Sequence, residues 1–163
     1  MLFRSQAALT GHLVLSTLHT NDSPTALTRL LDLGVAAYLV ASTVDAVLAQ
    51  RLVRTICPSC RREVSPDPAL ARRVDLAALG VTRLWAGAGC DACRGTGYRG
   101  RTGIYELLVM DAELRREVQQ RRGSEELRAL ALQKGMRSLF DDGLRLVRSG
   151  VTSIDEVLRV ARG

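Results

Sequence analysis

The stretch GCDACRGTGYRGRTGIYE, residues 89–106, decides how this chain is interpreted. It contains two cysteines separated by two residues, together with glycines and arginines. Glycine destabilises the interior of a helix, and a buried strand is seldom this polar. The composition is typical of backbone that folds tightly around a bound ion, so the cysteines are the first residues to examine.

A second cysteine pair lies about thirty residues earlier, in the sequence CPSC at 57–60. Two residues between cysteines let both sulfurs turn toward one ion, and two such pairs form the tetrahedral set of four thiolates that structural Zn²⁺ prefers. Every cysteine of the 163-residue chain is used in this way. The spacing therefore predicts a structural zinc site whose ligands are Cys57, Cys60, Cys90 and Cys93.

The four cysteines could also have roles other than binding a structural zinc ion. An iron centre with four thiolate ligands is chemically allowed and stays open. Disulfides need an oxidising compartment, and the N-terminus MLFRSQAALTG lacks the apolar region of a signal peptide. A thioredoxin-like pair needs one C-x-x-C motif in a βαβ context. A catalytic zinc is disfavoured because a closed shell of four sulfurs leaves no open position.

The charge of the chain is basic, with a formal net charge of +6, and Lys134 is its single lysine. An arginine-rich balance can indicate nucleic-acid binding, but the arginines are scattered and few aromatic residues accompany them. We expect no nucleic-acid partner, although a non-enzymatic zinc ribbon that binds nucleic acid or protein remains the alternative. Lys134 lies in ALQKGMRS, so the chain has no Walker A loop.

The first part of the chain has the pattern of an α/β layer. A short apolar run from about Leu13 to Leu18 predicts a buried strand. A helix should follow, with Ser23 as its cap, Pro24 in its first turn and an end at Gly34. A second helix is expected from about Ala37 to Val53, which gives the strand–helix order of an α/β fold.

The remaining sequence divides into an insert and a helical part. The insert contains all four cysteines, and a short helix is expected inside it from about Pro68 to Leu79. Later helices are expected to begin just after the capping residues Asp111, Ser124 and Ser138. The last helix should begin at Ser153, which forms the spacing of a capping box with Glu156. The expected divisions are residues 1–54, 55–102 and 103–163.

Longer stretches carry a resemblance to a known family. The second cysteine pair matches C-x-x-C-x-G-x-G of DnaJ-type chaperones, but the first pair lacks the glycines, and that match ends there. A wider match, from about Gln6 to Val160, resembles the C-terminal part of the type II secretion and type IV pilus assembly ATPases. It is carried by ALTGHLVLSTLHTNDSPTALTRLLDLGV, VLAQRLVRTICPSC, GCDACRGTGYRGRTGIYELL and SLFDDGLRLVRSGVTSIDEVLRV.

This resemblance implies a fold and a function. The fold is the edge of a RecA-like P-loop domain, then a four-cysteine zinc element and a mainly helical lobe. The family's ATPases are hexameric rings that use ATP and Mg²⁺ to drive pilus or pseudopilus assembly and protein export, in the cytoplasm beneath inner-membrane partners. The Walker A, acidic and Walker B motifs of the family would precede residue 1. We therefore expect a fragment or truncated chain that is inactive alone.

The two histidines, His12 and His19, match the family's His box. From the residues alone, a histidine at the end of a strand is most simply a structural hydrogen-bonding group. His19 lies at the C-terminal end of the predicted strand, where α/β sheets bind ligands. The resemblance implies that His19 contacts the γ-phosphate of ATP and that His12 helps to position the loop. Arg99 and Arg101 are expected in a turn, either solvated or against a neighbouring subunit or secretion component.

Overall fold

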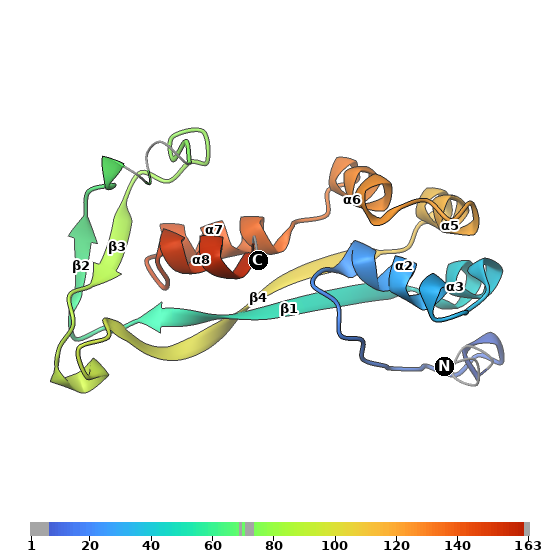
Figure 1. The fold of residues 1–163 in the computed structure, drawn as a ribbon, viewed down its shortest axis with the longest axis horizontal. Coiled ribbons are helices and arrows are strands. Elements are labelled where there is room, and N and C mark those ends of the chain that lie inside the picture. Colours follow the sequence, from blue (N-terminus) through green and yellow to red (C-terminus); the bar gives the residue numbers. More distant parts are fainter. Residues whose placement is uncertain (1–6, 69, 71–73, 162–163) are drawn as a thin grey trace. The chain divides into compact units, whose positions relative to one another are not determined.

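The computed structural model of the chain describes residues 7–68, 70 and 74–161 and has a mixed α/β fold (Figure 1). The described residues form two compact units. Unit 1 comprises the residues up to Ala49 together with Glu106–Ser138, and unit 2 comprises Gln50–Tyr105 together with the residues from Leu139 onward. No helix in these described ranges is long and apolar enough to cross a membrane.

Two long strands, β1 (Ala46–Ile56) and β4 (Tyr98–Val109), hydrogen-bond to each other (Figure 1). Strand β1 corrects the helix predicted from Ala37 to Val53, because helix α3 covers only Ala37–Thr43. Side chains in β1 alternate between exposed and partly buried, with the period of two that a strand requires. The apolar residues of this segment fit a helical period equally well, and the long-range pairing with β4 determines the outcome.

Strand β4 runs through the glycine-rich stretch, which is too polar for a buried strand, and its polar part is exposed. Arg99 and Arg101 lie within β4 and are exposed, not in a turn. Farther along the strand, Ile104, Glu106 and Leu108 are buried, while the residues between them are exposed. A strand with one solvated face can contain many polar residues, which explains the misleading composition.

The segment from His12 to Thr20 corrects the predicted strand from Leu13 to Leu18. It has no regular secondary structure, and the side chains of Leu13 and Leu15 are 88% and 85% exposed. A strand is stable only when a neighbour satisfies its backbone groups. Within the described residues β1 pairs with β4 and β2 with β3, so this apolar segment has no neighbouring strand.

Unit 1 has a core formed by helices α2 (Ser23–Asp32), α3, α5 (Ala112–Gln119) and α6 (Ser124–Gln133) with one face of β4. The predicted helix near Pro24 is confirmed as α2, and its Leu27 and Leu31 are buried in this core. The other large buried side chains of the core are Val35, Leu39, Val40, Leu108, Met110, Leu114, Val118 and Leu127.

The helix caps of unit 1 match the sequence prediction at one of three positions. Asp111 caps α5 as expected, and its carboxylate accepts the backbone N–H groups of Glu113 and Leu114. Helix α2 is capped by Asp22 instead of Ser23, and α6 is capped by Gly123 instead of Ser124. In both wrong cases the predicted cap is the first helical residue, because a neighbouring residue adopts the extended backbone that a cap requires.

Unit 2 contains strands β2 (Arg61–Val64) and β3 (Leu84–Gly87), which pair antiparallel, and helices α7 (Leu139–Arg148) and α8 (Ile154–Ala161). Helix α7 begins directly after Ser138, as expected. The helices pack closely because a Cβ at Gly143 would lie 2.5 Å from Val157 Cγ1. The predicted helix from about Pro68 to Leu79 lies partly outside the described residues, and positions 76–80 form turns.

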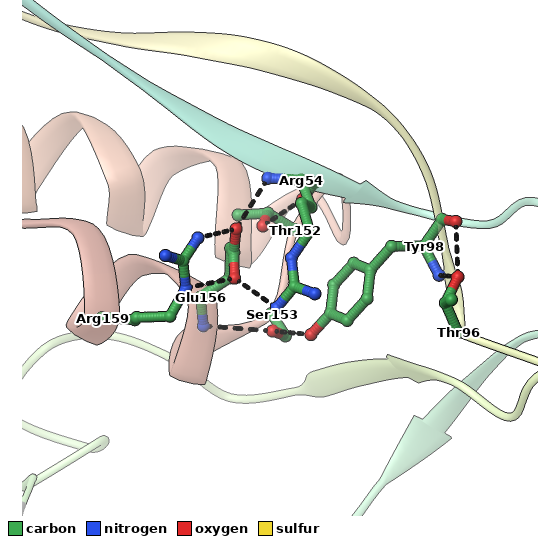
Figure 2. A network of polar contacts seen from close by, with 7 residues as sticks. All are labelled: Arg54, Thr96, Tyr98, Thr152, Ser153, Glu156 and Arg159. Carbon is green, nitrogen blue, oxygen red and sulfur yellow. Dashed lines mark hydrogen bonds and ion pairs between the residues drawn. The ribbon is translucent and has the colours of Figure 1, made fainter.

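Helix α8 is joined to β1 by a buried carboxylate (Figure 2). Ser153 Oγ accepts the backbone N–H of Glu156 at 3.3 Å, which confirms the predicted cap. The Glu156 side chain, however, accepts the backbone N–H of Arg54 in β1, with 3.0 Å between N and Oε1. The carboxylate therefore connects two elements about a hundred residues apart instead of closing a capping box.

Two arginines and a tyrosine complete this network (Figure 2). The fully buried Glu156 carboxylate pairs with Arg54 Nη2 at 2.8 Å and with Arg159 Nη2 at 2.6 Å. The Arg54 guanidinium lies 4.2 Å from the centre of the Tyr98 ring, and the Tyr98 hydroxyl is 2.7 Å from Ser153 Oγ. Burial raises the pKa of Glu156, but the hydrogen bonds from Arg159 and Arg54 outweigh it and hold the pKa at about 2.

We predict that Glu156→Gln destabilises the chain by roughly 3 kcal/mol at neutral pH, because it removes the charge that both arginines pair with. The folded pKa of about 2 lies below the reference value of 4.5, so the carboxylate stabilises the fold above pH 4.5. This contribution is lost as the pH falls from 4.5 toward 2. Urea unfolding of both proteins at several pH values should show the difference shrinking below pH 4.5.

The exposed neighbour Asp155 provides the matched control, since Asp155→Asn removes a carboxylate from the same helical turn. We expect this variant to unfold at nearly the same urea concentration as the native chain. A Glu156→Gln protein that is as stable as the native chain at pH 7 would contradict the assigned ion pairs. A difference in free energy of unfolding that does not change with pH would contradict them as well.

Candidate metal centre

The four cysteines converge in unit 2, where their Sγ atoms all lie within 4.8 Å of one another. The separations are 3.9 Å for Cys57–Cys90 and for Cys60–Cys93, and 3.8 Å for Cys90–Cys93. Four sulfurs at a Zn–S distance of about 2.3 Å in a tetrahedron are about 3.8 Å apart. The donor set thus fits one tetrahedral metal ion, and the sulfurs are too far apart for disulfides.

The second cysteine pair is shaped by a single turn of 3₁₀ helix, η1 (Asp91–Cys93). The backbone N–H groups of Cys90 and Gly97 both donate to Cys93 Sγ, at 3.2 Å each. These donors point at the sulfur, and they stabilise a negative charge on it. A Cβ at Gly97 would lie 2.5 Å from the Gly87 carbonyl oxygen. Glycine is therefore required at position 97, where the backbone passes close to the end of β3.

The first cysteine pair follows directly from the end of β1 at Ile56. The backbone N–H of Cys57 donates to the Gly97 carbonyl at 2.9 Å, and the Cys60 carbonyl accepts the N–H of Ala88 at 3.0 Å. The residues of the first pair are therefore held by backbone hydrogen bonds to Ala88 and Gly97, which lie on either side of the second pair. These backbone hydrogen bonds bring the two cysteine pairs together. A bound ion would then join the two pairs through their side chains.

The cysteines differ in acidity. Burial raises the pKa of the Cys93 thiol, but the N–H groups of Cys90 and Gly97 outweigh burial and lower it to about 6. Burial and the neighbouring sulfurs raise the pKa of Cys60 to about 11. Binding of the ion must release the proton of Cys60.

The histidines of the predicted His box lie outside this cluster. His12 is exposed, and its Nδ1 is 3.0 Å from Thr10 Oγ1. His19 is also exposed, three residues before the cap of α2. Among the described residues, the group that could bind a metal contains the four cysteines and neither histidine.

Sequence reasoning missed the buried carboxylate of Glu106 in unit 1. Its side chain is 1% exposed and accepts the backbone N–H of Ser23 at 2.9 Å and the Ser23 hydroxyl at 2.6 Å. One signal was available: Glu106 occupies the inward phase of the alternation set by Ile104 and Leu108. A charged residue at an inward position requires partners from other parts of the fold.

The chain matches the family model described as "Type II/IV secretion system protein" over residues 3–159. It is 50% identical over 157 residues to the type II secretion system protein HxcR of Pseudomonas aeruginosa, and the match covers 96% of this chain and 30% of HxcR. It is 46% identical over 156 residues to the type IV pilus assembly ATPase PilB of Thermus thermophilus, covering 94% and 18% of the two chains.

A solved structure shows the same fold. The X-ray structure of the Legionella pneumophila ATPase DotB matches with a TM-score of 0.58 and 22% identity, over 98% of this chain and 34% of that one. The chain thus spans about a third or less of the length of each of these proteins.

We predict that the purified chain binds one metal ion and that Cys90→Ser lowers the metal content by at least about tenfold. Loss of one ligand also lowers the free energy of unfolding, because ion binding contributes to folding. Elemental analysis and thermal unfolding test both effects. Ser59→Ala changes an exposed residue between two ligands and should keep its metal. A native chain that is folded and metal-free would contradict the prediction.

Proposed function

The chain belongs to the type II/IV secretion system protein family, and we propose on that basis that it supplies the His box and the metal-tied element of a secretion or pilus-assembly ATPase. The observation that carries this proposal is the match of residues 3–159 to the family model, together with the similarity to a type II secretion system protein and a type IV pilus assembly ATPase. The larger protein would be a hexamer that couples ATP hydrolysis to pilus or pseudopilus assembly and protein export.

Within that ATPase, residues 1–54 would belong to the edge of a RecA-like domain, residues 55–102 would contain the zinc, and residues 103–163 would form the helical lobe. We assign Zn²⁺ to the cysteine cluster because four thiolates at tetrahedral spacing suit this ion. When bound, zinc supplies structural cross-linking, since four sulfurs leave no position for a substrate. The residues of the chain then act on the nucleotide only through side chains outside the cluster.

His19 is the side chain that we assign to the nucleotide. It is exposed, and it precedes the loop Thr20–Asn21–Asp22 that begins helix α2. An imidazole N–H can donate to the γ-phosphate, and the loss of this contact on hydrolysis would signal the nucleotide state to the rest of the subunit. His12 would hold the start of the same segment. The partners we propose are identical subunits and inner-membrane secretion components, and not nucleic acid.

We predict that the 163-residue chain alone hydrolyses no ATP, because it has no lysine in a phosphate-binding loop. A phosphate-release assay on the purified chain should read background with Mg²⁺ and ATP present. Turnover that persists through purification and disappears in His19→Ala would contradict this prediction.

We predict that His19→Ala lowers hydrolysis by at least about tenfold in a complete ATPase, corresponding to about 1.4 kcal/mol of lost transition-state stabilisation. The suitable protein is HxcR with its matched segment replaced by residues 7–161 of this chain, to which it is 50% identical. Metal content and melting temperature should stay unchanged, because the His19 side chain is exposed.

Thr17→Ala is the matched control, since Thr17 is exposed in the same segment. It should hydrolyse ATP at the rate of the parent hybrid. If His19→Ala hydrolyses ATP normally or unfolds, His19 is a structural residue. If the hybrid binds nucleic acid tightly and never hydrolyses ATP, the zinc-ribbon alternative is favoured.

A further inference from the structure

The loop from His19 to Asp22, called the His19 loop below, leads into helix α2, whose first residue is held by a buried carboxylate in unit 1. Glu106 is 1% exposed, at an inward position of β4 where an apolar residue would be expected. Removing a carboxylate from water is costly unless charged or hydrogen-bonding groups replace the water. The groups that replace it here come from the start of helix α2 and from helix α6.

The start of helix α2 supplies two donors to this carboxylate. Glu106 Oε1 accepts the backbone N–H of Ser23 at 2.9 Å and the Ser23 hydroxyl at 2.6 Å. Ser23 is the first residue of α2, and its hydroxyl is fully buried with the rest of the residue. The carboxylate therefore holds both the backbone and the side chain of one residue, which fixes its position and its rotamer.

Arg128 in helix α6 connects the same carboxylate to the loop. Its Nη2 lies 2.6 Å from Asp22 Oδ2, and its Nη1 lies 3.7 Å from Glu106 Oε2. Asp22 in turn accepts the backbone N–H of Thr25 through Oδ1 at 2.8 Å. The planar guanidinium presents a separate nitrogen to each of the two carboxylates.

These contacts occupy the donors at the start of α2. The N–H of Ser23 binds Glu106, Pro24 has no N–H, and the N–H of Thr25 binds Asp22. A helix N-terminus often binds phosphate with these same groups. In this chain they are already used by carboxylates, so a phosphate would have to be contacted by side chains of the preceding loop.

We propose that Glu106 and Arg128 are positioning residues that hold the His19 loop in place for the nucleotide. The inference rests on the proposed function of His19. Asp22 lies three residues after His19, and Thr20 Oγ1 donates to the Asp22 carbonyl at 3.2 Å, which extends the anchored region toward the histidine. Loss of either positioning residue would release the loop while the core of unit 1 stays packed.

The first test uses the 163-residue chain without nucleotide, so it is independent of the proposed function. Amide hydrogen exchange is measured for Ser23 and Thr25 in the native chain, in Glu106→Gln and in Arg128→Gln. Glu106→Gln keeps the shape and one oxygen acceptor but loses the charge. We expect exchange at Ser23 to accelerate by at least about tenfold in Glu106→Gln, and exchange at Thr25 to accelerate in Arg128→Gln.

Two controls separate local release from unfolding. Glu125→Gln and Arg116→Gln remove exposed charges from helices of the same unit and should leave exchange at both amides unchanged. Exchange within α7 of unit 2 should also be unchanged in all variants. Exchange at Ser23 and Thr25 within about twofold of the native rate in both variants would overturn the proposal.

The second test measures steady-state hydrolysis in the HxcR hybrid. A positioning role predicts that Glu106→Gln lowers kcat by at least about tenfold while KM changes by less than about threefold, measured at a temperature where the variant is still fully folded. Normal kcat in a variant whose loop exchanges faster would show that the anchored loop does not serve catalysis, and would overturn the positioning role. Normal hydrolysis in His19→Ala as well would place the failure in the proposed function instead.

Discussion

The convergence of four sulfurs in unit 2 is the constraint on which the rest of that unit depends. Strand β1 ends at Ile56 and leads directly into the first cysteine pair, while β4 begins at Tyr98 just after the second. The hydrogen bond from Cys57 N–H to the Gly97 carbonyl joins these two ends. Sulfurs this close repel one another once they are deprotonated, and a divalent ion removes that repulsion. The ion would therefore fix the start of the β1–β4 pairing.

Both units use a buried carboxylate to connect distant segments. Glu156 accepts the backbone N–H of Arg54, and Glu106 accepts that of Ser23. In each case arginine provides the counter-charge, from Arg54 and Arg159 in unit 2 and from Arg128 in unit 1. Guanidinium groups suit this role because they bind two oxygens in a plane and are weakly hydrated. The excess of arginine over lysine thus has a structural use at these sites, beside whatever sets the composition of the whole chain.

The features that the sequence predicted correctly are those set by neighbouring residues. The spacing within each cysteine pair, the helix α2 and the Asp111 cap each depend on a few positions close together in the chain. The predictions are wrong where a residue far away in the sequence determines the local structure. Residues 44–53 fit a helix until β4 pairs with them, and Leu13–Leu18 has the composition of a strand but no neighbour among the described residues. Glu156 was placed in a local capping box because its true partner, Arg54, is 102 positions away.

The geometry also limits how this chain could act on a nucleotide, as proposed. The metal site is closed by four sulfurs, so an ion there cannot polarise a phosphate or activate water. The start of α2, which would otherwise attract an anion, is neutralised by Asp22 and Glu106. The remaining candidates are side chains of the exposed segment before α2, and His19 is the one nearest the anchored loop whose ring can donate a hydrogen bond. Its usefulness would then depend less on its own chemistry than on how firmly Asp22 and Ser23 are held. If His19 senses the nucleotide as proposed, the determinants of that sensing would lie in β4 and α6, on residues that do not touch the nucleotide.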